Sequence, residues 1–221
     1  MHSFDQIFAS AARRKGGAEA LDAELRKPLS PAEIAQTPDD RWLAEMARQL
    51  FQAGFKWQVI AAKWPGFEEA FEGFDPARVA AYGDEDITRM MESGLVVRNA
   101  SKLTSVIDNA RFVTELAREH GSAGAFFGSW PTSDFVGLLK LMAKRGSRLG
   151  GVAGQRVLHE MGCDGFVLTR YVATRLIAEG VIDDLTIGKR DMEAIQTAFD
   201  TWARQSGRSF TEISQILARS L

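Results

Sequence analysis

Apolar residues in this chain recur at intervals of three and four positions, and strict alternation of apolar and polar residues is almost absent. This spacing lines apolar side chains along one face of a helix, whereas a half-buried strand would need a period of two. One such face, between Asp39 and Gly54, carries Leu43, Met46, Ala47, Leu50 and Phe51. We therefore predict an all-α protein.

Capping and breaking residues divide this pattern into separate helices. Asp39 or Asp40 is a suitable N-cap for the first of them, and Gly54 is a suitable stop. Asp75 followed by Pro76 opens another helix, with proline at its first position. The further helices that we expect run over residues 101–121, 132–144, 154–161, 166–178, 189–205 and 211–220.

Size and composition narrow the class of protein. The chain has 221 residues, of which 45% are hydrophobic and 25% charged, so it can bury a core and is not disordered throughout. Its longest segment without a charged residue or histidine, residues 121–133, is too short and too rich in glycine to span a bilayer. A single cysteine, Cys163, excludes an internal disulfide. With no secretory signal after Met1, we expect a cytoplasmic protein without a membrane partner.

Charge is nearly balanced overall, with a net charge of −2, but it is unevenly distributed. Residues 64–94 contain eight acidic and two basic residues, while residues 140–175 contain seven basic and two acidic ones. A basic face on an otherwise neutral protein can bind phosphates. The alternative interpretation is that these charged residues lie on solvated helix faces and that their uneven distribution has no function.

A glycine-rich segment lies inside the basic stretch, between two helical patterns. Glycines allow a tight hairpin whose backbone N–H groups point into the start of the next helix, where phosphate can bind. This is the helix-hairpin-helix device, which grips the DNA backbone without reading bases. The alternative is a flexible interhelical loop. The hairpin is expected near residues 146–156, and its candidate DNA-binding residues are Arg148, Gly150, Gly151, Val152, Ala153, Gly154, Gln155 and Arg156.

Several elements of the sequence, in the same order, resemble the DNA-3-methyladenine glycosylase I family. Residues 51–57 read FQAGFKW, residues 71–80 read FEGFDPARVA, residues 94–103 read GLVVRNASKL and residues 107–111 read IDNAR. The corresponding family patterns are QAG-x-x-W, F-DP-x-x-V-A, G-[IL]-[IV]-R-x-x-x-K-[IL] and N-A-R. The likeness resumes with KRG at residues 144–146 and covers most of residues 42–160.

The resemblance implies a helix-hairpin-helix glycosylase fold over residues 1–221, a single domain with two lobes and an aromatic pocket between them. Enzymes of this family flip an alkylated base out of duplex DNA and cut its glycosidic bond. Trp57 matches the tryptophan on which the flipped base stacks, although it could instead be an ordinary core aromatic. Trp42, fifteen residues earlier, could face the same pocket.

The chain departs from the family at the pocket carboxylate. The glutamate expected eight residues before the tryptophan is Gln49 here, which can hydrogen-bond an adenine edge but does not attract a cationic base. Glu45, one helical turn earlier, could substitute, or it could be a solvated residue near the start of the helix. The family often carries a zinc site, but His159 and Cys163 have no further ligands nearby in sequence, so we expect neither a metal nor a cofactor.

Beyond the hairpin the chain resembles the wider superfamily more than this family. Thr169 occupies the place where a catalytic aspartate is usual, with Tyr171 nearby, and neither is an anionic base at neutral pH. Tyr171 is a weak catalytic candidate, or a helix aromatic that faces the core. Gln155 stands where lyase-competent relatives carry a lysine nucleophile, so strand cleavage through an amine is not expected.

Three functions remain open at this point. The first is a monofunctional glycosylase that releases alkylated purines such as 3-methyladenine in base excision repair, acting as a monomer on double-stranded DNA. The second is a non-catalytic relative that binds damaged DNA, which the replacements at Gln49 and Thr169 favour. The third is a helical protein whose pocket serves a different ligand or a protein partner.

Overall fold

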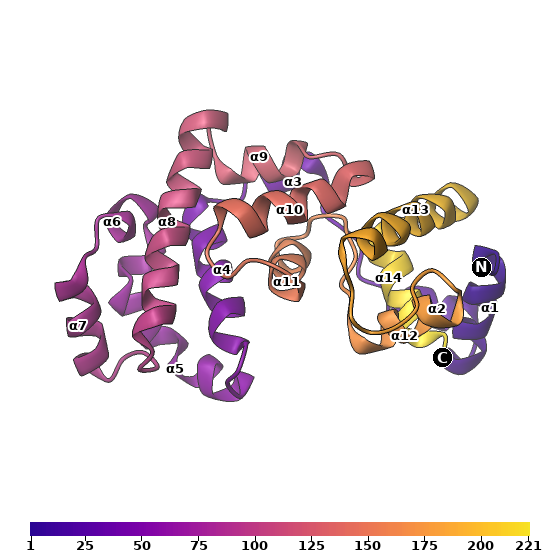
Figure 1. The fold of residues 1–221 in the computed structure, drawn as a ribbon, viewed down its shortest axis with the longest axis horizontal. Helices are drawn as coiled ribbons and strands as arrows, with labels where there is room; N and C mark the ends of the chain where they lie inside the picture. Colours follow the sequence, from indigo (N-terminus) through magenta and orange to yellow (C-terminus); the bar gives the residue numbers. More distant parts are fainter. The chain divides into compact units, whose positions relative to one another are not determined.

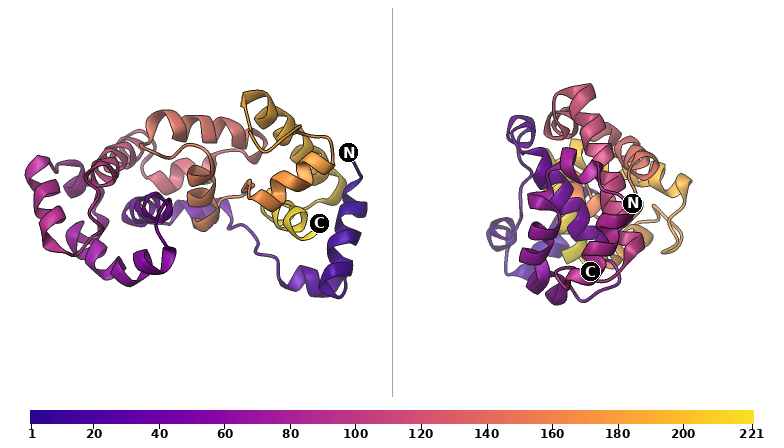
Figure 2. Two further views of the ribbon diagram at one scale, coloured as in Figure 1. Left: turned by 60° about the horizontal axis from the view of Figure 1, so that its bottom comes forward. Right: turned by 90° about the vertical axis from the view of Figure 1, so that its left-hand side faces the viewer.

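The computed structural model describes residues 1–221, and all of its regular elements are helical. Fourteen α-helices and two short 3-10 helices follow one another without a strand, which confirms the all-α prediction. The chain forms two compact units (Figures 1 and 2). We call Met1–Leu29, Trp130–Leu138 and Gly162–Leu221 the terminal unit, and Ser30–Ser129 and Leu139–Met161 the hairpin unit.

The hairpin unit is built around one long helix, α8 (Ala100–His120). The side chain of Asn99 caps its first turn, and the chain leaves it at Gly121. Helices α4, α6, α7 and α9 pack against α8, while α3 packs on α9 and α11 on α4. The other elements of this unit are α3 (Pro31–Ala35), α4 (Asp39–Gln52), α5 (Trp57–Ala70), η1 (Glu72–Phe74), α6 (Pro76–Ala80), α7 (Asp84–Ser93), α9 (Ala123–Ser129) and α11 (Val152–Glu160).

The terminal unit combines the two ends of the chain, as Figure 1 shows. The backbone N–H of Phe4 donates to the side chain of Gln205 at 2.8 Å, and the hydroxyl of Ser10 donates to the carbonyl of Ser220 at 3.0 Å. Helix α14 packs against α1, α12 and α13. The elements here are α1 (Phe4–Lys15), α2 (Ala18–Ala23), η2 (Thr132–Asp134), α12 (Arg170–Ala178), α13 (Lys189–Ser206) and α14 (Phe210–Arg219), with the start of α10 (Phe135–Arg145).

Each unit has its own aromatic core. In the hairpin unit Trp42 stacks on Phe127 with ring centroids 4.3 Å apart, and a series of rings continues through α5 and η1, formed by Phe51, Trp64, Phe67, Phe71 and Phe74. In the terminal unit the buried ring of Phe166 contacts the rings of Phe135, Phe199 and Phe210. Aromatic pairs at these separations add stabilisation beyond the apolar area that they bury.

Several helix boundaries differ from the sequence prediction; residues 132–134, for example, form the 3-10 helix η2, and α10 begins at Phe135. Pro38, not Asp39 or Asp40, is the N-cap of α4, because the carboxylate of Asp39 accepts instead from the backbone N–H of Ala123 at 2.8 Å. Helix α11 begins at Val152, two residues before the predicted start. Residues 166–169, predicted as helix, are not helical; the Val167 N–H donates to the hydroxyl of Ser214 on α14, and the Thr169 N–H donates to the carbonyl of Val167.

Candidate nucleic-acid interface

The glycine-rich segment forms a hairpin between α10 and α11. Its backbone turns at Arg148, with φ of 58°, and at Gly151, with φ of 59° and ψ of −137°, immediately before α11 begins. Gly150 and Gly151 are exposed, and Val152 is 39% exposed at the first position of the helix. The first N–H groups of a helix have no partner inside it, so this corner offers donors to a phosphate.

Not all of the predicted hairpin residues lie in the turn. Val152, Ala153 and Gly154 form the first turn of α11 rather than part of the loop. Gly154 and Gln155 are buried, so their side-chain positions face the protein and not a ligand. The exposed part of the candidate surface therefore consists of Arg148, Gly150, Gly151, Val152 and Arg156, while Leu149 is buried.

Helix α8 holds the hairpin in place from beneath. The fully buried side chain of Asn109 donates through Nδ2 to the carbonyl of Ser147 at 3.1 Å and accepts through Oδ1 from the Ser147 N–H at 2.7 Å. About two turns closer to the start of α8, the hydroxyl of Ser101 accepts from Nη2 of Arg148 at 2.8 Å. The hairpin is thus fixed by directional contacts and is not a free loop.

The basic residues at the hairpin differ in how much charge they can present to DNA. Arg145 forms ion pairs with Glu115 and Glu119, which also raise the pKa of its guanidinium. Its charge is therefore largely neutralised within the protein. Arg148 and Arg156 are exposed, and the hydrogen bond from Arg148 to a neutral hydroxyl leaves its charge uncompensated.

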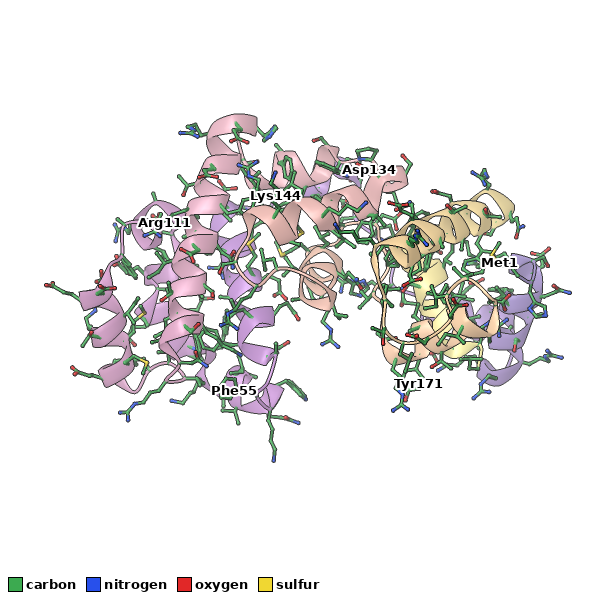
Figure 3. All side chains as sticks on the ribbon, viewed as in Figure 1. Met1, Phe55, Arg111, Asp134, Lys144 and Tyr171 are labelled. Atoms are coloured by element: carbon green, nitrogen blue, oxygen red, sulfur yellow. The ribbon has the colours of Figure 1, made fainter.

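A second exposed element of the hairpin unit is the turn between α4 and α5, residues 53–57, which we call the aromatic turn. Gly54, with φ of 91°, reverses the chain, and Trp57 becomes the first residue of α5. Phe55 projects from this turn in Figure 3 and is 36% exposed, while Trp57 is 61% exposed. Trp57 is therefore a surface aromatic and not a core residue.

The aromatic turn lines an open cavity of about 750 Å³. Its lining comes from both candidate DNA-binding elements, because Arg156 of α11 lines the cavity together with Phe55 and Trp57. Gln52, Lys56 and Gln58 complete the lining. A cationic side chain and a flat aromatic surface in one cavity are the combination that binds a nucleotide, through its phosphate and its base.

Gln49 is buried in α4 and is committed to a neighbour. Its Nε2 donates to Oε1 of Glu45 at 2.7 Å, and only 7% of the residue is exposed. The Glu45 side chain is 12% exposed and also faces Nε of Arg48 at 3.5 Å, so it is not the solvated residue that was one of our expectations. The guanidinium of Arg48 lies over the ring of Trp64, 4.3 Å from its centroid. A carboxylate only accepts, so the Gln49 amide is held with its NH₂ group toward Glu45.

The predicted pocket residues are only partly brought together. Gln49 and Trp57 belong to the same unit, but Gln49 does not line the cavity that Trp57 shares with Arg156. Trp42 is completely buried against Phe127, and its indole N–H has no hydrogen-bond partner. Trp42 is thus a core residue of the hairpin unit and is not part of the cavity wall.

The remaining catalytic candidates, Thr169 and Tyr171, lie in the terminal unit. The Thr169 hydroxyl caps α12 by accepting from the Val172 N–H at 3.3 Å. Tyr171, labelled in Figure 3, is 68% exposed, so it does not face the core. Cys163 is buried, and burial raises the pKa of its thiol to about 12. No group of three potential metal ligands includes Cys163 or His159.

None of the helices has the length and the hydrophobicity of a membrane-spanning segment.

Two buried polar residues of α8 were not identified as functional from the sequence. Asn109 fixes the hairpin, and Lys102 binds the end of α4, donating from Nζ to the carbonyls of Leu50 and Ala53. Both lie inside the motifs that carry the family resemblance, GLVVRNASKL and IDNAR. Polar residues at core-facing positions of a helical pattern were the available signal, since such residues are buried only with partners.

Comparisons with known proteins find similar sequences and similar folds among DNA glycosylases. Residues 35–137 match the model of the methyladenine glycosylase family. A segment of 60 residues is 35% identical to DNA-3-methyladenine glycosylase 1 of Escherichia coli and 33% identical to DNA-3-methyladenine glycosylase of Haemophilus influenzae. In both comparisons the segment is 27% of this chain and 32% of the relative, so the chain spans about a third of the length of these relatives.

Solved structures extend the likeness of the fold over more of the chain. A structure of 3-methyladenine DNA glycosylase I from Staphylococcus aureus has a TM-score of 0.51 at 22% identity, with 71% of this chain and 91% of that one covered. The 8-oxoguanine glycosylase/lyase of Methanocaldococcus jannaschii, in complex with DNA containing 8-oxoguanine, has a TM-score of 0.57 at 12% identity and covers 96% of this chain and 95% of its own. At these identities the similarity shows that the chain has the helical glycosylase fold.

Proposed function

Because this chain is a divergent relative of the methyladenine glycosylases, we propose that it is a monofunctional DNA glycosylase. Its substrates would be alkylated purines such as 3-methyladenine in double-stranded DNA. The observation that carries the proposal is the position of Trp57, a large exposed aromatic in a cavity that Arg156 of the hairpin helix also lines. Contact between the apolar ring of an exposed tryptophan and water is unfavourable, and stacking on a flipped base removes that contact.

In this proposal the hairpin binds the DNA backbone. Backbone N–H groups at Gly151 and the start of α11, together with Arg148 and Arg156, would bind backbone phosphates without reading sequence. Such contacts release counterions, so duplex affinity should fall steeply as the salt concentration rises. DNA binding of this kind would work equally on damaged and undamaged duplexes, which leaves lesion selection to the aromatic turn.

The chemistry requires little of the protein once the base has been extracted. 3-Methyladenine carries a positive charge and is a good leaving group, so water can attack C1′ without a strong protein base. We assign no proton transfer to Thr169, whose hydroxyl caps α12. Tyr171, exposed on the terminal unit, stays a weak catalytic candidate. No metal or cofactor is part of this proposal.

Gln49 does not line the Trp57 cavity, so in this proposal it would read the edge of the flipped base where the base reaches α4. Since its NH₂ group is bound to Glu45, its amide oxygen is the end that can accept a hydrogen bond from an exocyclic amino group. The amide oxygen carries only a partial charge, which is weaker than the family carboxylate for a cationic base. We expect this exchange to lower the release of charged lesions relative to an enzyme with glutamate at this position.

The alternative function is a non-catalytic protein that binds damaged DNA. It is favoured by one specific observation, the absence of any anionic side chain at both Gln49 and Thr169. Under either function we expect a monomer that acts in the cytoplasm on double-stranded DNA. The two functions differ in whether a base is released.

The direct test is incubation with randomly methylated duplex DNA, followed by identification of released bases by mass. Release of 3-methyladenine supports the glycosylase, and lesion binding without release supports the alternative. Trp57→Ala should lower lesion affinity by about 10- to 100-fold, since base stacking is worth about 1–3 kcal/mol, while plain duplex binding barely changes. Leu185→Ala, which removes another exposed apolar side chain, serves as the control.

Gln49→Glu provides a second test of the same site, because it restores the family carboxylate and should raise release of cationic 3-methyladenine. It also places two carboxylates side by side, which makes Glu45 a necessary partner variant. If Gln49→Glu changes nothing and Trp57→Ala affects lesion and plain duplex equally, no flipped base is read at this site.

A further inference from the structure

Lys102 occupies a position that is unfavourable for a cation unless it is bound by other groups. It lies in the first turn of α8, where the helix dipole is positive, and only 8% of it is exposed. Burial, and then the charge of Arg148, lower the pKa of its amine. A buried lysine in this position requires compensation from elsewhere in the fold.

The compensation comes from the end of α4. Nζ of Lys102 donates to the carbonyls of Leu50, at 2.9 Å, and Ala53. These carbonyls belong to the C-terminal end of a helix, which carries negative partial charge and has no further partners inside the helix. Lys102 therefore acts as the C-terminal cap of α4, supplied from another helix.

The same ammonium group contacts the aromatic turn directly. It lies 4.7 Å from the ring centroid of Phe55 and 5.6 Å from that of Phe51. Ala53, which accepts one of its hydrogen bonds, is the first residue of the turn that ends at Trp57. The turn thus has an anchor at each side of Gly54, although its own residues are mostly exposed.

The neighbouring residue of α8 ties in the hairpin, because Ser101 accepts from Arg148. Two successive residues in the first turn of one rigid helix therefore fix the two elements assigned to DNA contact. Helix α8 is 21 residues long and packs through its buried face on α4 and α6, which makes it a stable reference for both.

We propose that Lys102 is a positioning residue that sets the conformation of the aromatic turn and through it the orientation of Trp57. It does not touch the base, and its amine is occupied by carbonyls, so it is not a nucleophile. The inference rests on the proposed function only for its consequence in DNA binding. The positioning itself is a property of the free protein.

The test compares Lys102→Met with the wild type. Methionine keeps most of the apolar stem and removes the charge and the donors. Lys63→Met is the matched control, because Nζ of Lys63 also donates to a backbone carbonyl, that of Gly94, at 2.7 Å in the same unit. Lys102→Arg, which keeps a cation and several donors, should restore the wild-type behaviour.

Two readouts are measured for each variant. The first is the indole N–H resonance of Trp57 in a ¹H–¹⁵N spectrum of the ¹⁵N-labelled protein, assigned by its loss in Trp57→Ala. The second is the lesion preference, the ratio of the affinities for methylated and plain duplex. We expect Lys102→Met to shift the Trp57 resonance, to leave that of the core residue Trp42 in place, and to reduce lesion preference about tenfold, within the range expected for lost base stacking.

The outcomes separate this inference from the proposed function. An unmoved Trp57 resonance in Lys102→Met overturns the inference, as does an equal shift in Lys63→Met. A shifted resonance with no lesion preference in any variant, the wild type included, supports the positioning role and refutes lesion recognition at the aromatic turn. If Lys102→Met does not fold, Lys102→Gln, which keeps a neutral donor, is judged by the same resonance and the same ratio.

Discussion

The hairpin gives the sharpest single test, substitution of Gly151 by valine. Gly151 has φ of 59° and ψ of −137°, a backbone conformation that β-branched residues do not adopt without strain. A Cβ atom at this position would meet no atom within 4 Å, so the cost is conformational and does not come from a clash. Strain of this kind amounts to about 1–3 kcal/mol.

That strain should appear as lost affinity for DNA. The turn is exposed, so the variant can relax to a strain-free conformation in which its N–H groups no longer converge on a phosphate. Restoring the bound conformation then costs about 1–3 kcal/mol, which corresponds to about a 5- to 150-fold weaker complex. Because phosphate contacts carry no lesion information, plain and methylated duplexes should lose affinity by the same factor.

Fluorescence anisotropy with a labelled duplex at fixed salt measures this loss. Gly150→Ala is the matched control, because Gly150 has no positive φ and its Cβ would make only an ordinary contact of 3.6 Å with Ala143. Circular dichroism and the urea midpoint show whether each variant is folded. Unchanged affinity in folded Gly151→Val, equal to that of Gly150→Ala, would refute the assignment of phosphate contacts to this hairpin.

Three further predictions concern stability and chemistry. Gly154→Ala should destabilise the protein in urea titrations, because a Cβ there would lie 2.4 Å from the carbonyl oxygen of Leu149; an unchanged urea midpoint would contradict this packing. Borohydride treatment with abasic DNA should trap no covalent adduct, since Gln155 replaces the lysine nucleophile, and a trapped complex would require another amine at C1′. Glu179 is buried, which alone would raise its pKa, but hydrogen bonds from the backbone and ring of His2 and the charge of Arg175 lower it overall. The carboxylate therefore stabilises the fold above about pH 4.5 and loses this contribution as the pH falls below it, so Glu179→Gln should flatten the acid limb of a stability–pH curve.

Much of the fold could be predicted because helix periodicity and caps are local properties. Ser101 to Gly121 was expected as one long helix, and α8 runs from Ala100 to His120. The non-helical segment before α12 was missed, because the backbone N–H groups of Gly165 and Val167 donate to hydroxyls of α14, which are distant in sequence. Local patterns carry no information about such partners.

The site was predictable only in its outline. The motif around Trp57 located the aromatic turn, and the glycines located the hairpin. The burial of Trp42 and the pairing of Gln49 with Glu45 depend on which helix faces are covered by others. The role of Lys102 could not be predicted for a similar reason. Its partners are backbone carbonyl groups, which every residue has, so the sequence does not show which of them the lysine binds.

The discontinuity of the terminal unit has a consequence for synthesis on the ribosome. This unit needs residues 1–29 together with residues 162–221, whereas the hairpin unit is complete once residue 161 has been made. Domains fold as units during translation. We therefore expect the hairpin unit to fold first. The apolar side chains of α1 and α2 stay exposed until α13 and α14 have been synthesised. A nascent chain stalled soon after residue 161 has emerged would bury Trp42 but leave Phe4 accessible to chaperones and proteases.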